Sequence, residues 1–416
     1  MIKAALDYKP NYFEIISLVF VLLYYGSVVV IGGGEINFFN KLIYPFYVLF
    51  LFTFLISKFY TREFLFYEYK KIILFIWCIT IYLNYSIIMN YADLNIAWLL
   101  GDFSVIMCLL LSIFIGKKVD LFKNINNYFE YLVFLLFILM SLDFIVNYNP
   151  DEGQLRMYSR LMIVPAFFLY QTITKSSKIY FSLYLICLIL SIFTNMRYAF
   201  IMTVFLMLIF FVLFVRKYLS NIFKVKNILF FISLAILFFL TLLSDEAFLE
   251  RWRFFKLFSS DINTNQIGLI STFAVRYFEV VDTISHIKNT FNPLTVFFGN
   301  GAGAAFKADL FWTWANNEWY NINSFSSQSH KHILHFGPVR VFFRYGVLGL
   351  IIVGIFFTDL IRHMKISYHK LNINFVILIS LVSLSLRFVI QPIFNDLLMS
   401  ILIIAFYNLR DRKKLT

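Results

Sequence analysis

Long runs of apolar residues recur along most of the chain, and short polar connections separate them. A run of roughly 20 apolar residues is long enough to cross the hydrocarbon core of a bilayer as a helix. The pattern therefore predicts about twelve membrane-spanning helices, with a break near Asn195 that is only briefly polar. Their approximate cores are residues 12–32, 42–57, 71–90, 95–116, 128–147, 157–174, 178–194, 197–215, 227–243, 336–360, 372–390 and 394–409.

One long polar block interrupts this pattern between the ninth and tenth predicted helices. The chain is expected to divide into nine helices with short loops over 1–243, a large loop over 244–335, and three helices with a basic tail over 336–416. Ser271 or Thr272 can cap a helix within the block, so the loop is expected to be partly helical. The fold class predicted is an all-α polytopic integral membrane protein.

The composition agrees with this class. The chain is 61% hydrophobic and only 14% charged, whereas soluble domains average about 45–50% apolar and about 25% charged residues. The first apolar run follows Lys3 and Lys9 and has neither the short core nor the small-residue cleavage site of a signal peptide, so it is expected to be an uncleaved helix. Cys78, Cys108 and Cys187 lie within apolar runs without CxxC spacing, which indicates neither a disulfide framework nor a zinc site.

The net charge of +13 is explained by membrane topology. Lysine and arginine gather in every second connection and at the C-terminus, and this bias predicts that those loops and both termini are cytoplasmic. The block at 244–335 is then extracytoplasmic. Because the charge does not form one stripe, no nucleic-acid partner is expected. The basic connections contain Lys58, Arg62, Lys70 and Lys71; Lys117, Lys118 and Lys123; Lys175 and Lys178; Arg216, Lys217, Lys224 and Lys226; Arg362, Lys365 and Lys370; and the tail Arg410, Arg412, Lys413 and Lys414.

Arginines on the outer side run against this bias, so each requires a partner. Planar guanidinium groups suit phosphate and pyrophosphate, which indicates an anionic substrate at the outer surface. The alternatives are snorkelling to lipid phosphates and internal ion pairs. The number of arginines on one side favours a functional role. They are Arg340 and Arg344, four residues apart on one helix face; Arg156 and Arg160, which repeat that spacing; Arg197, after a short polar break; and Arg387, near Gln391.

Three histidines close the long block, at His330, His332 and His335. Their offsets would place only the last two on a common helix face, and the region has no HExxH, so no metal site is expected. A histidine at the water–membrane boundary fits better as a proton acceptor or a hydrogen-bond donor to a sugar.

The helix expected within the block would carry Arg276, Glu279, Thr283 and His286 on one face. Glu279 and Asp282 are each candidates for a general base or for a simple ion pair with the arginine.

A glycine-rich turn, Phe298-Gly-Asn-Gly-Ala-Gly303, precedes the histidines. It lacks the Gly-Lys-Ser/Thr of a phosphate loop and the sheet context of a dinucleotide fingerprint. A tight turn that positions a loop is the simpler interpretation, and backbone N–H groups that contact an anion are the other.

An outer loop late in the chain, a Gly-x-Gly turn, a histidine, an apolar stretch and Gly-x-x-Gly together resemble the O-antigen polymerase and O-antigen ligase superfamily. In that family a His-Asn pair precedes Gly-x-x-Gly by about eleven residues. Here His335 stands eleven residues before Gly346, and Phe336 replaces the asparagine. Met196-Arg197 is similar to the family's Ser-Arg, without the serine, and Arg276 corresponds to an arginine in the early helix of the large loop.

The resemblance implies a GT-C-like, metal-independent membrane glycosyltransferase without a cofactor, in the inner membrane of a bacterial cell. Its substrate would be an undecaprenyl-pyrophosphate-linked oligosaccharide on the outer leaflet, with membrane lipid, a flippase and a chain-length regulator as further partners. The catalytic candidates are His335, Glu279 and Arg276. The candidates that would bind pyrophosphate or lipid phosphate are Arg197, Arg340, Arg344, Arg156 and Arg160.

Three activities stay open at this point. The first is a repeat-unit polymerase, favoured by a Phe, Ile, Asn and Tyr richness that suggests an AT-rich gene, as polysaccharide clusters often have. The second is a ligase that transfers the glycan to lipid A–core. The third, from another class, is a polysaccharide-unit flippase, although the long outer block disfavours it.

Overall fold

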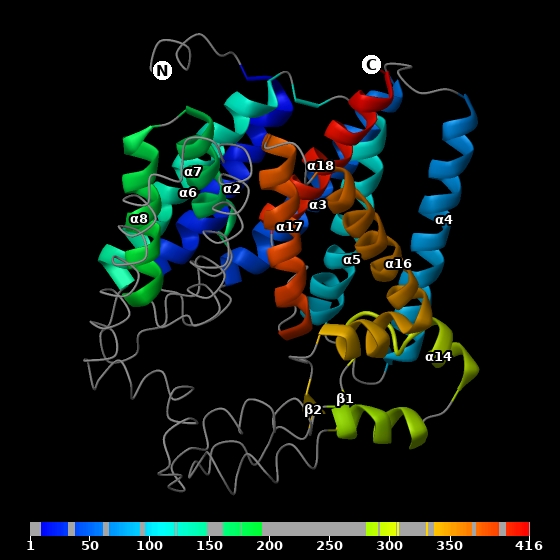
Figure 1. The fold of residues 1–416 in the computed structure, drawn as a ribbon. Helices are drawn as coiled ribbons and strands as arrows, with labels where there is room; N and C mark the ends of the chain where they lie inside the picture. Colours follow the sequence, from blue (N-terminus) through cyan, green and yellow to red (C-terminus); the bar gives the residue numbers. More distant parts are fainter. Residues whose placement is uncertain are drawn as a thin grey trace, which may run out of the picture. The chain divides into compact units, whose positions relative to one another are not determined.

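The computed structural model describes residues 10–31, 38–60, 66–91, 96–119, 121–122, 124–147, 161–175, 177–193, 280–289, 292–304, 306–307, 330–331, 337–367, 372–390 and 397–415. Within these ranges the chain is helical apart from turns, short connections and one antiparallel pair of two-residue strands (Figure 1). The elements are α2 (Tyr12–Ile31), α3 (Phe38–Tyr60), α4 (Phe66–Met89), α5 (Ile96–Lys118), α6 (Ile125–Asn147), α7 (Ile163–Lys175), α8 (Lys178–Phe193), α14 (Pro293–Phe298), β1 (Phe306–Lys307), β2 (His330–Lys331), α16 (Gly337–Ser367), α17 (Ile373–Ile390) and α18 (Leu397–Leu415).

A helix stands at each predicted apolar core that falls within the described residues. The two remaining cores, 197–215 and 227–243, lie outside those residues. Four of the described helices contain a stretch long and apolar enough to cross a membrane, at Tyr12–Val30, Leu99–Lys117, Ile125–Asn147 and Gly337–His363. The protein is therefore a helical membrane protein.

The chain divides into two compact units. One unit joins Met1–Val146 with Tyr277–Thr416, and the other is Asn147–Arg276. In the second unit, α7 and α8 pack against each other through buried aromatic side chains such as Phe168 and Tyr180.

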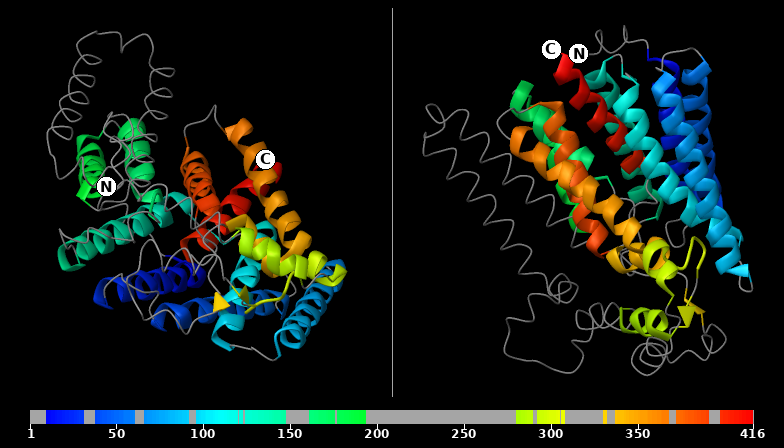
Figure 2. Two further views of the ribbon diagram at one scale, coloured as in Figure 1. Left: turned by 90° about the horizontal axis from the view of Figure 1, so that it is seen from below. Right: turned by 90° about the vertical axis from the view of Figure 1, so that its right-hand side faces the viewer.

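Helices α5 and α18 form the centre of the larger unit (Figure 2). They approach closely at Gly116, where an added Cβ would lie 2.8 Å from the carbonyl oxygen of Ile404. Asn408 of α18 joins this helix to the end of α5. Its side chain accepts from the backbone N–H of Leu121 at 3.0 Å and donates to the carbonyl of Gly116 at 3.2 Å. Around this pair, α3 packs against α5, and α17 lies between α16 and α18.

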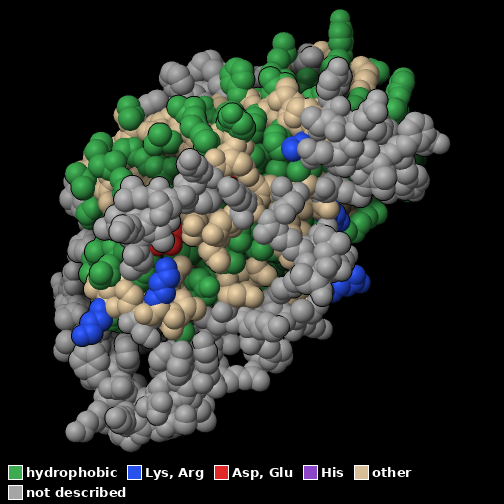
Figure 3. All heavy atoms as spheres, turned by 90° about the horizontal axis from the view of Figure 1, so that it is seen from above, with side chains coloured by type: hydrophobic (Ala, Val, Ile, Leu, Met, Phe, Trp, Pro, Cys, Tyr) green, Lys and Arg blue, Asp and Glu red, His purple; other side chains and the backbone are tan. Residues whose placement is uncertain are grey.

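The outward faces of these helices carry large apolar side chains. On α4, Ile73, Leu74, Trp77 and Ile81 are more than half exposed, which suits a surface whose solvent is lipid. In Figure 3, which views the end at which α18 finishes, hydrophobic side chains outnumber lysine and arginine among the side chains that are described. Cys108 and Cys187 are buried, whereas Cys78 is exposed on α4.

The elements of the long block in the larger unit lie at the opposite end from the end of α18. Figures 1 and 2 place α14 beside the last turns of α4 and the first turns of α16, with β1 and β2 beyond them. Residues 280–289 are helical there, as predicted for this part of the block. His286 on this helix packs its ring against Phe343 of α16, with the ring centroids 5.7 Å apart.

Candidate functional site

The glycine-rich turn is wedged between three helices. It follows α14, whose N-cap Asn292 accepts a hydrogen bond from the N–H of Leu294 at 2.9 Å. Gly299, Gly301 and Gly303 have φ values of 77°, 90° and 81°, a region open to glycine and unfavourable for other residues. The chain can therefore reverse direction sharply and enter the space bordered by α4, α5 and α16.

Each glycine of the turn also allows a close approach to a different neighbour. A Cβ on Gly301 would lie 2.8 Å from the Cα of Ser86 on α4, and one on Gly303 would lie 2.9 Å from the Cα of Leu99 on α5. A Cβ on Gly299 would overlap the carbonyl group of Arg344 on α16.

The two glycine motifs of the sequence meet in one contact. Gly346 has φ 62° and ψ −157° and interrupts the helical backbone of α16. A Cβ there would overlap the carbonyl of Phe297 and the nitrogen of Gly299. The kink in α16 thus receives the end of α14, and the Gly-x-Gly turn and the Gly-x-x-Gly stretch form one interface.

Backbone N–H groups of the turn donate hydrogen bonds to acceptors within the protein. Asn300 donates to the carbonyl of Phe343 at 2.7 Å, and Gly301 donates to the carbonyl of Arg344 at 3.1 Å. Ala302 donates to Ser86 Oγ at 3.0 Å. The N–H of Gly303 donates at 2.9 Å to Asp102 Oδ2, so the anion that this turn contacts is a side chain of the protein itself.

One face of α4 holds the turn from the other side. Tyr82 donates its hydroxyl to the carbonyl of Arg344 at 2.8 Å, and Tyr85 donates to the carbonyl of Gly299 at 2.7 Å. Asn90 donates to the carbonyl of Asn300 at 2.9 Å. Tyr82 and Tyr85 are three residues apart and share a face of α4, and Asn90 lies in the turn directly after this helix.

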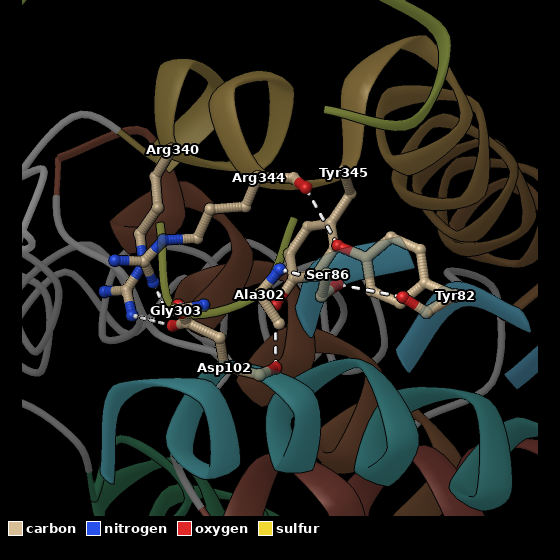
Figure 4. Close-up of polar contacts among 8 residues, drawn as sticks. All are labelled: Tyr82, Ser86, Asp102, Ala302, Gly303, Arg340, Arg344 and Tyr345. Atoms are coloured by element: carbon tan, nitrogen blue, oxygen red, sulfur yellow. Dashed lines mark hydrogen bonds and ion pairs between the residues drawn. The ribbon is translucent and has the colours of Figure 1, made fainter. Parts of the chain in front are cut away.

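Asp102 is the centre of the site. It lies on α5 beneath the turn, and both Arg340 and Arg344 reach it from the first turns of α16 (Figure 4). Arg344 Nη1 and Arg340 Nη2 contact the same carboxylate oxygen, Oδ1, the latter at 3.2 Å. Tyr345 donates its hydroxyl to the backbone carbonyl of Asp102 at 2.7 Å.

The three charged side chains differ in exposure. The side chains of Arg344 and Asp102 are 0% and 2% exposed, and that of Arg340 is 12% exposed. Two guanidinium groups and one carboxylate carry a formal charge of +1 together. Arg340 is the more exposed of the two arginines, so an added anion could contact the cluster there.

The prediction that Arg340 and Arg344 share one helix face is confirmed, because both contact one carboxylate oxygen. The internal ion pair, which the sequence left as an alternative for these arginines, is present. The other site candidates lie outside the described residues: Arg156, Arg160, Arg197, Arg276, Glu279 and His335, together with His332. His330 begins β2 and pairs in register with Lys307 of β1.

Asp102, Ser86 and Tyr82 were not among the residues that the sequence indicated. The signal for Asp102 was available, since a carboxylate within an apolar helix indicates a functional or paired residue.

Asp282, one of the candidate bases, is buried on the 280–289 helix. Among the described residues, no group of three or more His, Cys, Asp or Glu side chains is arranged to hold a metal ion.

Comparison with known protein families, with curated proteins and with solved structures found no match to this chain.

Proposed function

We propose that this protein is a polysaccharide repeat-unit polymerase of the O-antigen type. It would transfer a growing glycan from undecaprenyl pyrophosphate to the sugar of a new lipid-linked repeat unit, at the outer face of the cytoplasmic membrane. The observation that carries the proposal is the Asp102–Arg340–Arg344 cluster, which has an excess of positive charge where the long block meets the helices. The resemblance of the sequence motifs to the polymerase and ligase superfamily supports the same activity.

The proposed reaction makes one glycosidic bond and breaks one bond to phosphate. A hydroxyl oxygen of the acceptor sugar attacks the anomeric carbon of the donor, and the bond from that carbon to the pyrophosphate oxygen breaks. The leaving pyrophosphate keeps the electron pair, so a nearby arginine stabilises its growing negative charge. The hydroxyl proton passes to a general base, for which His335 is the first candidate and Glu279 the second.

The arrangement of the larger unit supports the proposed topology. The described elements of the long block lie at one end of the helices, and α18 finishes at the other (Figure 1). With the basic loops and tail in the cytoplasm, the cluster would lie near the outer surface. The pyrophosphate groups of undecaprenyl-linked glycans on the outer leaflet would lie near the same surface.

A deletion strain tests the proposal. Its lipid-linked and surface glycans are separated on a gel, before and after complementation with wild type. A polymerase predicts single repeat units on the surface core of the deletion strain and a restored ladder after complementation. Arg362→Gln, at the far end of α16, is the matched control for arginine substitutions in the cluster and should restore the ladder.

Two outcomes would replace the proposal with another function. Core without any repeat unit, together with lipid-linked polymer, would identify a ligase. Repeat units retained on the inner leaflet would identify a flippase.

A further inference from the structure

We infer that the two arginines of the cluster have different roles: Arg344 and Asp102 form a neutral structural pair, and Arg340 is the residue that binds a phosphate or pyrophosphate group. This inference deepens the proposed function, because it names the contact residue for the anionic part of the substrate. It also assigns to Asp102 a positioning role that the sequence motifs do not carry.

The burial of Arg344 argues for the structural role. Its side chain is 0% exposed and contacts Asp102, which is 2% exposed. Its backbone carbonyl accepts from both Tyr82 and Gly301, so the residue is fixed at the point where the turn meets α16. Because this side chain is 0% exposed, a ligand could not reach its guanidinium without a rearrangement of the residues around it.

The geometry of Arg340 argues for the binding role. It lies one helical turn nearer to the start of α16, and its side chain is 12% exposed. A single Nη2 contact of 3.2 Å joins it to Asp102 Oδ1, an oxygen that Arg344 also contacts. A guanidinium group has five N–H donors, which suit bidentate contact with phosphate oxygens.

Asp102 connects this binding residue to the outer block. Its Oδ1 holds the arginines, and its Oδ2 accepts from the N–H of Gly303. The carboxylate therefore fixes Arg340 relative to the turn.

The test measures anion binding by the purified full-length protein, independently of glycan synthesis. The protein is placed in phosphatidylcholine nanodiscs, and its melting temperature is recorded with millimolar inorganic pyrophosphate and with sodium chloride of equal ionic strength. The variants are Arg340→Gln, Arg344→Gln, Asp102→Asn and the double variant Asp102→Asn/Arg344→Gln, with Arg362→Gln as the control for loss of an arginine from α16.

The inference predicts that pyrophosphate raises the melting temperature of wild type, the control and the double variant. Arg340→Gln should fold and lose at least four fifths of that shift. Asp102→Asn should lower protein abundance at least threefold, because it leaves Arg344 buried without its carboxylate, and the double variant should recover most of that loss. Arg344→Gln should lower protein abundance less, because Arg340 still contacts Asp102. The double variant should bind pyrophosphate with an affinity within about tenfold of wild type, since Arg340 keeps its charge and loses one charge-assisted hydrogen bond.

Other results would overturn the inference. An Arg340→Gln protein that responds to pyrophosphate like wild type removes Arg340 as the contact. A folded double variant without a response would show that anion binding requires Arg344 or Asp102 as well as Arg340, and would contradict a purely structural role for that pair.

Phosphatidylglycerol nanodiscs identify the source of the phosphate. If that lipid stabilises wild type but not Arg340→Gln, and pyrophosphate adds nothing, Arg340 binds a lipid headgroup. A protein that binds pyrophosphate through Arg340 but restores no glycan ladder would support this inference and contradict the polymerase.

Discussion

At the scale of single residues, the site depends on positions where a side chain cannot be added. Gly299 has φ 77° and ψ −174° and lies against the carbonyl of Arg344. This backbone region is essentially limited to glycine. The turn therefore reaches Asp102 only because its glycines accept both an unusual backbone and a close neighbour.

Gly299→Ala should destabilise the protein, by about 1–3 kcal/mol from the backbone conformation alone and further from the overlap with α16. Gly354→Ala is the matched control, because a Cβ on that helical glycine meets nothing within 4 Å. The measurement is the fraction of monodisperse protein that survives heating in detergent. Equal survival of the two variants would contradict the account of the turn.

The sequence indicated Arg340, Arg344 and both glycine motifs, because charged residues and glycines stand out from an apolar chain. It did not indicate that they meet, since the contacts between Gly299 and Arg344 or between Gly303 and Asp102 join residues far apart in the chain. The hydropathy pattern does not single out Asp102, because one carboxylate hardly changes the mean hydropathy of its helix.

At the scale of elements, hydropathy located the helices but not their pairing or their kinks. The apolar run of α16 continues through Gly346, whose backbone is not helical, and a hydropathy pattern does not register a break of this kind. Hydropathy also does not identify which helices pack together, because a side chain that faces lipid is as apolar as one that faces another helix. At Gly116, the contact between α5 and α18 leaves no space for a larger residue.

Gly116→Ala should weaken the packing of α5 against α18, because the new Cβ would lie 2.8 Å from the carbonyl oxygen of Ile404 and 2.9 Å from Tyr407 Cβ. Gly101→Ala on the same helix meets nothing within 4 Å, and alanine is the better helix former by roughly 1 kcal/mol. Gly101→Ala should therefore melt at or above the wild-type temperature and Gly116→Ala several degrees below it. The reverse order would exclude this glycine as the contact point.

At the scale of the whole molecule, the proposed function requires that the long block and the C-terminus lie on opposite sides of the membrane. The ends of the larger unit agree with this requirement, since α14 and α18 finish at different ends (Figure 2). Charge placement alone predicted the same orientation, because the basic connections recur at every second loop.

Topology can be measured with reporters in living cells. A green fluorescent protein fused after Thr416 should fluoresce, and alkaline phosphatase at that position should be inactive. Alkaline phosphatase inserted at Ser326, within the long block, should be active. An active phosphatase at the C-terminus would place the block in the cytoplasm and separate the cluster from its proposed substrate.

We propose above that the cluster serves glycan transfer from a lipid pyrophosphate. The most direct test of this proposal combines purified protein with lipid-linked repeat units extracted from the deletion strain, and follows the length of the lipid-linked glycan. We predict a ladder of longer glycans with wild type and with Arg362→Gln, released carrier pyrophosphate in proportion to the bonds formed, and at least a hundredfold slower extension with Arg340→Gln. Folded wild-type protein that leaves every repeat unit unextended, or a folded Arg340→Gln variant that extends them at the wild-type rate, would contradict the account.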